Sequence, residues 1–134
     1  MPKPNFTGTW KFNPAKSVLQ ITQPDETIIV IDHQEPFFRI TRTHKVDKKS
    51  DSFTVELTTD GKKISIDQPE VRLRARAYWD DDALVFDSDL VRGSEAATNV
   101  VRYSFGEDLN SIVAEEQYQS KNLNYKNVWV LDKQ

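Results

Sequence analysis

The side chains best suited to chemistry in this sequence are His33, His44, Glu116 and four tyrosines, and their spacing matches no established catalytic motif. Cysteine is absent, which excludes thiol nucleophiles, thiolate metal sites and disulfides. No His-x-His or His-Glu-x-x-His pair, nucleophile elbow, phosphate loop or dinucleotide-binding glycine pattern occurs. The chemistry left open is acid–base catalysis by Glu116, His44 or a tyrosine in an apolar cavity, where burial shifts pKa values.

One acidic cluster, Asp80-Asp81-Asp82, has enough oxygen atoms to suggest a calcium site. It lacks the spaced ligands and the distal Glu of a calcium-binding loop, so a plain polar turn is the favoured interpretation. Two histidines are too few for a histidine-rich metal site. We therefore expect neither a metal nor a cofactor.

Arg42 is the most informative cation, because it lies in a strongly alternating run. One face of residues 37–46 carries Phe38, Ile40, Arg42 and His44. If this face points inward, Arg42 borders an apolar space and needs either a carboxylate partner or an anionic ligand. The alternatives are an ion pair with Glu116, a place at an open rim, or a ligand with an acidic or strongly polar group.

The elements that must position these residues are β-strands, because hydrophobic residues alternate with polar ones almost throughout the chain. Turn signals such as Asp60-Gly61 and Arg92-Gly93-Ser94 separate short β-rich runs, and residues 47–51 form a polar connector. The predicted strands are 7–12, 26–33, 37–46, 52–59, 62–67, 71–79, 83–91, 97–105, 110–119 and 124–132. Consecutive hairpins would make an up-and-down meander.

An open sheet of this size exposes unpaired backbone groups at its edges, and closing it into a barrel removes them. We therefore predict an all-β fold: one up-and-down antiparallel barrel of about 8 to 10 strands, wide enough for one small ligand. The chain of 134 residues has room for one domain, 1–134.

Alternation also predicts which side chains line the cavity. The candidate ligand-binding residues are Phe38, Ile40, Arg42, His44, Val55, Leu57, Ala75, Ala77, Phe86, Tyr103, Glu116, Tyr118 and Trp129. Ala75 and Ala77 are small enough to leave open volume, unless large neighbours fill it. Arg72, Arg74 and Arg76 share the other face of their strand, where a solvated outer surface is favoured over an anion-binding ladder.

The opening Gly8-Thr9-Trp10-Lys11-Phe12-Asn13-Pro14-Ala15-Lys16-Ser17 resembles that of small bacterial lipocalin-like domains, and more distantly that of lipocalins and fatty-acid-binding proteins. Three further pieces resemble that group in order: 38–43, 59–62 and 79–85. The resemblance implies a calycin-type barrel. In lipocalins a basic residue late in the barrel covers the opening Trp, and Lys133 is the nearest candidate here.

The chain departs from fatty-acid-binding proteins at two places. Only residues 13–25 separate the first two predicted strands, which is too short for a helical lid. Trp129 and Leu131 stand where that family places an Arg-x-Tyr pair for a carboxylate. Fatty acid held in that manner is therefore disfavoured.

The amino-acid composition limits which kinds of partner we expect for this protein. The net charge is −3, and the 18 basic residues are scattered among 21 acids, so nucleic acid is not an expected partner. No run approaches the roughly 18 apolar residues of a membrane span. We expect a soluble protein, cytoplasmic as written or a secreted or periplasmic domain without its signal, and a monomer or weak dimer.

The favoured function is binding of a small apolar or amphipathic molecule in the barrel cavity. Two alternatives stay open: a metal-free enzyme that uses acid–base groups of the cavity, and a structural or interaction barrel with a filled core.

Overall fold

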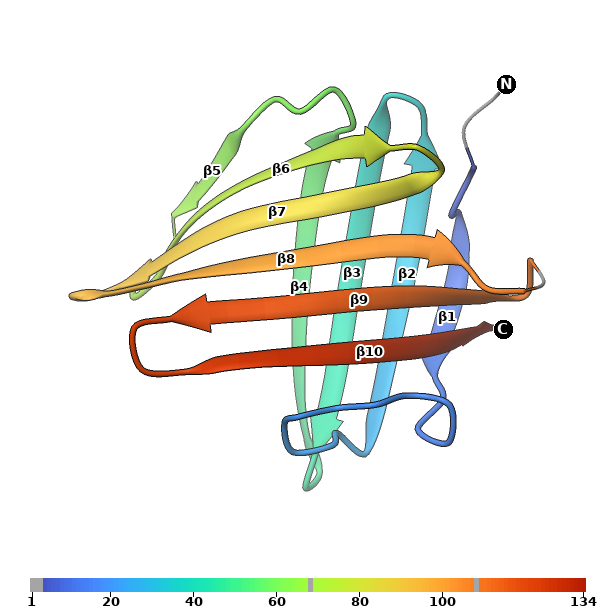
Figure 1. Cartoon of the computed structure of the whole chain (residues 1–134), viewed down its shortest axis with the longest axis horizontal. Helices are drawn as coiled ribbons and strands as arrows, with labels where there is room; N and C mark the ends of the chain where they lie inside the picture. Colours follow the sequence, from blue (N-terminus) through green and yellow to red (C-terminus); the bar gives the residue numbers. More distant parts are fainter. Residues whose placement is uncertain (1–3, 68, 108) are drawn as a thin grey trace.

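The computed structural model describes residues 4–67, 69–107 and 109–134, and in these ranges every regular element is a β-strand. Figure 1 shows the strands wrapping around one interior. The strands are β1 (Gly8–Phe12), β2 (Glu26–Gln34), β3 (Phe37–Val46), β4 (Lys49–Thr58), β5 (Ile64–Asp67), β6 (Arg72–Asp80), β7 (Ala83–Arg92), β8 (Glu95–Phe105), β9 (Ser111–Ser120) and β10 (Asn124–Lys133). No helix that could cross a membrane occurs in the described part of the chain.

The strands form one antiparallel sheet in the order β4-β3-β2-β1-β10-β9-β8-β7-β6-β5. Pairing of β1 with β10 joins the two halves of the meander, and β4 and β5 are left as the edges. The residues that follow β4 pair with β6 across the gap between these edges: Asp60 bridges Tyr78, and the Gly61 N–H donates to the Ala77 carbonyl over 2.8 Å. The predicted up-and-down barrel is therefore confirmed, and it is nearly closed.

Two predicted connections differ from the structure. Asp60-Gly61 does provide a positive φ of 85° at Gly61, but it joins β4 to β5, which do not pair with each other, so it is not a hairpin turn. Residues 47–51 are not a loose connector. Asp47 and Lys48 alone make the turn, with φ angles of 49° and 68°, because two residues with positive φ match the twist of paired strands.

The end of the barrel that holds Phe6 and the end of β10 is packed with aromatic rings. Phe6 stacks on Phe105 at 4.9 Å between ring centroids, and Trp10 is only 1% exposed beneath β10. The Trp10 indole N–H donates to the Phe6 carbonyl, and the Lys133 ammonium lies 5.9 Å from the indole centroid. Trp10 is therefore buried at this end of the barrel, and Lys133, the candidate basic residue named from the sequence, covers it. We call this the closed end.

At the other end, here called the open end, residues 13–25 take the place between β1 and β2 without forming a helix. Val18 and Val128 exchange two backbone hydrogen bonds, at 2.9 and 2.8 Å. The Lys126 N–H donates to the side-chain carbonyl of Gln20, and the Gln20 N–H donates to the side-chain carbonyl of Asn127. The segment thus lies along β10 and continues the pairing that the short β1 begins (Figure 1).

Candidate functional site

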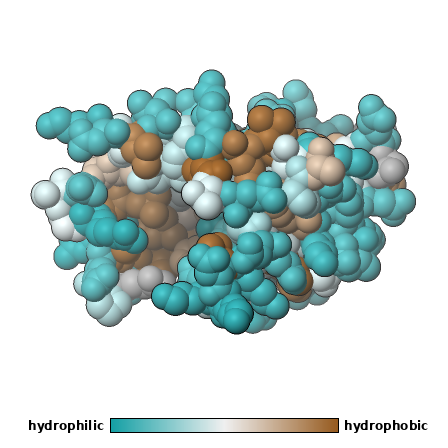
Figure 2. Space-filling view, turned by 90° about the horizontal axis from the view of Figure 1, so that it is seen from below, coloured by the Kyte–Doolittle hydropathy of each residue, from teal (hydrophilic) through white to brown (hydrophobic). Residues whose placement is uncertain are grey.

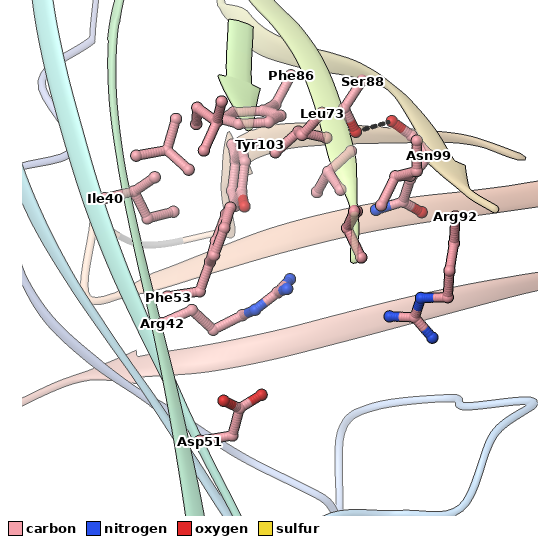
Figure 3. Close-up of a pocket in the computed structure, with 15 residues that line it drawn as sticks. Ile40, Arg42, Asp51, Phe53, Leu73, Phe86, Ser88, Arg92, Asn99 and Tyr103 are labelled. Atoms are coloured by element: carbon pink, nitrogen blue, oxygen red, sulfur yellow. Dashed lines mark hydrogen bonds between the residues drawn. The ribbon is translucent and has the colours of Figure 1, made fainter. Parts of the chain in front are cut away.

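A cavity of about 250 Å³ lies between the β3–β4 side of the barrel and strands β5 to β8. Its lining is Ile40, Arg42, Asp51, Phe53, Val55, Ile66, Val71, Leu73, Phe86, Ser88, Leu90, Arg92, Asn99, Val101 and Tyr103 (Figure 3). Most of these side chains are apolar. The strands place them there because alternate residues of each strand face the interior.

The cavity reaches the open end of the barrel. A second hollow of about 580 Å³ adjoins it between the β7–β8 and β9–β10 hairpins and shares Val71, Leu90 and Arg92 with it. Figure 2 shows an apolar recess surrounded by hydrophilic atoms on the face seen from below. A molecule can therefore enter the interior without separating paired strands.

Polarity changes along the axis of this cavity. Toward the closed end the strands contribute Ile40, Val55, Phe86 and Tyr103. Nearer the open end the same four strands, β3, β4, β7 and β8, contribute Arg42, Asp51, Arg92 and Asn99. The cavity is therefore apolar at its inner end and charged toward its mouth.

Arg42 lies on the inner face of β3, as predicted, beside Ile29 of β2 and Phe53 of β4 in the sheet register. Within the described ranges, its guanidinium makes no ion pair shorter than 4.0 Å, and its Nε is buried without a hydrogen-bond partner. An orphaned buried donor costs about 1–3 kcal/mol. Among the residues that the structure describes, Arg42 therefore has no carboxylate partner and its Nε has no acceptor.

Glu116 is not that acceptor, so the predicted alternative of an Arg42–Glu116 ion pair is wrong. Three neutral donors bind its carboxylate: the Asn127 amide and the Trp129 indole at Oε1, both at 2.9 Å, and the Asn99 amide at Oε2, at 3.0 Å. These donors fix the carboxylate on the β9–β10 wall. Its charge is thus stabilised by hydrogen bonds instead of a cation.

A small inner chamber of about 20 Å³ lies behind Arg42, a size suited to a single water molecule. Its walls are Thr27, Ile29, Arg42, His44, Val101, Tyr103, Ala114, Glu116 and Trp129. Burial, with a further contribution from the Arg42 charge, lowers the pKa of His44 to about 4. Burial raises the pKa of Tyr103 to about 12. Both side chains are therefore uncharged at neutral pH.

The predicted site residues fall into four groups. Ile40, Arg42, Val55, Phe86 and Tyr103 line the main cavity. The inner chamber holds His44, Glu116 and Trp129, together with Arg42 and Tyr103. Tyr118 lines the hollow at the mouth. Phe38, Leu57, Ala75 and Ala77 are buried in the packed core and line neither the main cavity nor the inner chamber.

The sequence left two alternatives for the two alanines, open volume beside them or a gap filled by large neighbours. Ala75 and Ala77 are 1% and 0% exposed and belong to the core cluster that contains Phe6, against which Phe105 packs. Both alanines therefore lie in the packed core and not on the wall of the cavity. In β6, Leu73 faces the cavity instead, one step nearer the open end.

Asp51, Ile66 and Arg92 line the cavity but were not among the predicted site residues. Asp51 and Arg92 had been assigned to turns, although each continues the alternation of its strand. Asp51 lies two residues before Phe53, and Arg92 lies two residues after Leu90. Extending the period-two pattern into the turns would have identified both of them.

No family model and no curated protein matches the chain. Solved structures do match. A secretory abundant heat soluble protein from Ramazzottius varieornatus shares 10% identity at a TM-score of 0.64, with 96% of this chain and 95% of that one covered. The zebrafish ileal bile acid-binding protein complexed with cholic acid shares 10% sequence identity at a TM-score of 0.61, with 96% of this chain and 98% of that one covered.

Human cRBP IV shares 13% identity at a TM-score of 0.55, with 94% of this chain and 97% of that one covered. These matches span nearly the whole of each chain at very low identity. They show that the chain shares the β-barrel fold of these proteins.

Proposed function

We propose that this protein binds a small apolar or amphipathic molecule in the barrel cavity. The observation that carries the proposal is a cavity of about 250 Å³ that is mostly apolar and contains the unpartnered Arg42. This volume is close to the lower end of the roughly 300–1,000 Å³ of typical ligand pockets. A filled-core barrel would not have this hollow.

The solved structures support the same proposal. One of the similar barrels was crystallised with cholic acid, an amphipathic molecule with an acidic group. Two observations weigh against the alternative of acid–base catalysis. The Glu116 carboxylate already accepts three hydrogen bonds, and His44 Nδ1 is engaged with the Thr27 hydroxyl at 2.6 Å.

The test is uptake of the neutral, environment-sensitive dye N-phenyl-1-naphthylamine by the wild type and by Leu73→Trp. Leu73 lines the cavity and is 7% exposed, so the larger indole should occupy the cavity and reduce dye fluorescence at saturation by about tenfold or more. Arg74→Trp is the matched control, because it adds the same ring on the outer face of the same strand.

The proposal holds if the wild type and Arg74→Trp take up the dye while folded Leu73→Trp does not. Folding is checked by far-ultraviolet circular dichroism and by thermal melting. Equal uptake by Leu73→Trp and the wild type would place the dye outside the cavity, and no uptake by the wild type would contradict the proposal directly.

A further inference from the structure

Two arginines face the same space from opposite walls. Figure 3 shows Arg42 projecting from one side of the cavity and Arg92 from the other, with Asp51 on the same side as Arg42. Neither arginine forms an ion pair within 4.0 Å in the part of the chain that the structure describes. By contrast, Arg39, Arg76 and Arg102 on the outer face each have a carboxylate partner.

The arginines lie at one end of the cavity only. Inward from Arg42 on β3 comes Ile40, and inward from Arg92 on β7 come Leu90, Ser88 and Phe86. The inner end therefore has no cation to receive an anion. An acidic group placed there would lose its hydration among apolar side chains, which is strongly unfavourable.

From this separation of charge and apolar surface, we propose that the ligand is an amphiphile with a single acidic headgroup, bound with its tail innermost. The tail lies against Ile40, Val55 and Phe86, and the headgroup lies between Arg42 and Arg92 near the mouth. This inference rests on the proposed binding function and adds the class and the orientation of the ligand.

The remaining charged groups near the mouth limit where the headgroup can lie. Asp51 borders the same space and is exposed at the beginning of β4, so it repels an anion from the β4 side. Glu116 is held away from this position by its three donors, Asn99 of β8 and Asn127 and Trp129 of β10. His44, next to Arg42 along the inner face of β3, is uncharged near neutral pH. The two arginines thus define the favourable position.

Orientation is measured by nuclear Overhauser effects between decanoate and protein labelled at Ile, Leu and Val methyl groups. The terminal methyl of decanoate should contact Ile40 and Val55. The methylene next to its carboxylate should contact Val71 and Leu90, which line the cavity near its mouth. The opposite pattern would overturn the orientation while leaving the proposed function intact.

The headgroup position is measured by titration of decanoate and its neutral analogue decanol. Arg92→Gln should weaken decanoate binding by about tenfold, because a charge-assisted contact is lost, and should change decanol binding by less than about twofold. Asp51→Asn should strengthen decanoate binding. Arg74→Gln, an exposed arginine on the outer face of β6, is the matched control and should change neither.

Each outcome decides a separate point. If Arg92→Gln binds decanoate as tightly as Arg74→Gln does, the two-arginine position for the headgroup is wrong. If decanol binds the wild type as tightly as decanoate, the acidic ligand class is wrong although the cavity binds amphiphiles. If decanoate, decanol and N-phenyl-1-naphthylamine all fail to bind, the proposed function itself has failed.

Discussion

Replacing Arg42 with Leu separates two roles that a buried arginine can have. If the guanidinium neutralised a buried carboxylate, its removal would strand that carboxylate and lower the free energy of unfolding by about 3–5 kcal/mol. The structure predicts otherwise, because Glu116 is already held by Asn99, Asn127 and Trp129. We therefore expect Arg42→Leu not to lower the free energy of unfolding of the ligand-free protein, and to raise it by up to about 1–3 kcal/mol because the orphaned Nε donor is removed.

The effect on ligand binding should be larger. A hydrogen bond to a charged group contributes about 1.5–3 kcal/mol, which corresponds to roughly 10- to 150-fold in the dissociation constant. Arg42→Leu should therefore weaken decanoate binding by about that factor and leave decanol binding nearly unchanged. Calorimetric titration of both ligands measures the difference, and urea denaturation of the free protein measures the stability.

Arg39→Leu is the matched control, since Arg39 lies on the same strand but faces outward. Its Nε is 3.5 Å from the Glu56 carboxylate and both side chains are exposed, so the pair contributes about 0–1 kcal/mol. Arg39→Leu should alter neither affinity. A loss of 3 kcal/mol or more on Arg42→Leu would refute the unpaired state of Arg42, and unchanged decanoate affinity would refute its role in binding the headgroup.

Two further predictions concern stability. Burial lowers the pKa of His44 from 6.5 in the unfolded chain to about 4 in the fold, so between these pH values the unfolded state binds more protons than the folded state. The free energy of unfolding should therefore fall as the pH decreases from about 6.5 to 4. Urea titrations at a series of pH values should show a weaker pH dependence for His44→Gln than for the wild type. If the wild type and His44→Gln show the same pH slope, His44 is not the responsible group. Ala77→Phe should overpack the core at the closed end and lower the free energy of unfolding by about 1–3 kcal/mol, whereas a variant as stable as the wild type would show that Ala77 borders free volume after all.

The inner face of β3 shows how far alternation alone can predict a site. Phe38 and Ile40 are buried, and Phe37 is 66% exposed, so the predicted register of this strand is confirmed. Moving the register by one residue would place the charged Arg39 in the core, and the apolar pattern excludes that. The position of Arg42 on the inner face follows from the same pattern.

Alternation does not predict the surroundings of a side chain where these depend on packing between segments far apart in the sequence. Ala75 and Ala77 have the pattern of cavity residues, yet both are buried in the core cluster and line neither the main cavity nor the inner chamber. Asp60-Gly61 has the composition of a hairpin turn, yet the strands that it joins do not pair with each other. The alternation of a strand predicts which face of the sheet each side chain is on, but it does not predict which residues of other strands that side chain contacts.

The partner of Arg42 illustrates this limit most clearly. The sequence by itself determined that the chain forms an antiparallel barrel and that Arg42 and Glu116 both face its interior, because side-chain direction is a local property of an extended backbone. Only the tertiary structure decided that Glu116 binds Asn99, Asn127 and Trp129 while Arg42 and Arg92 face open space. Those distances depend on how strands far apart in the chain curve around one another, and local sequence does not contain that curvature.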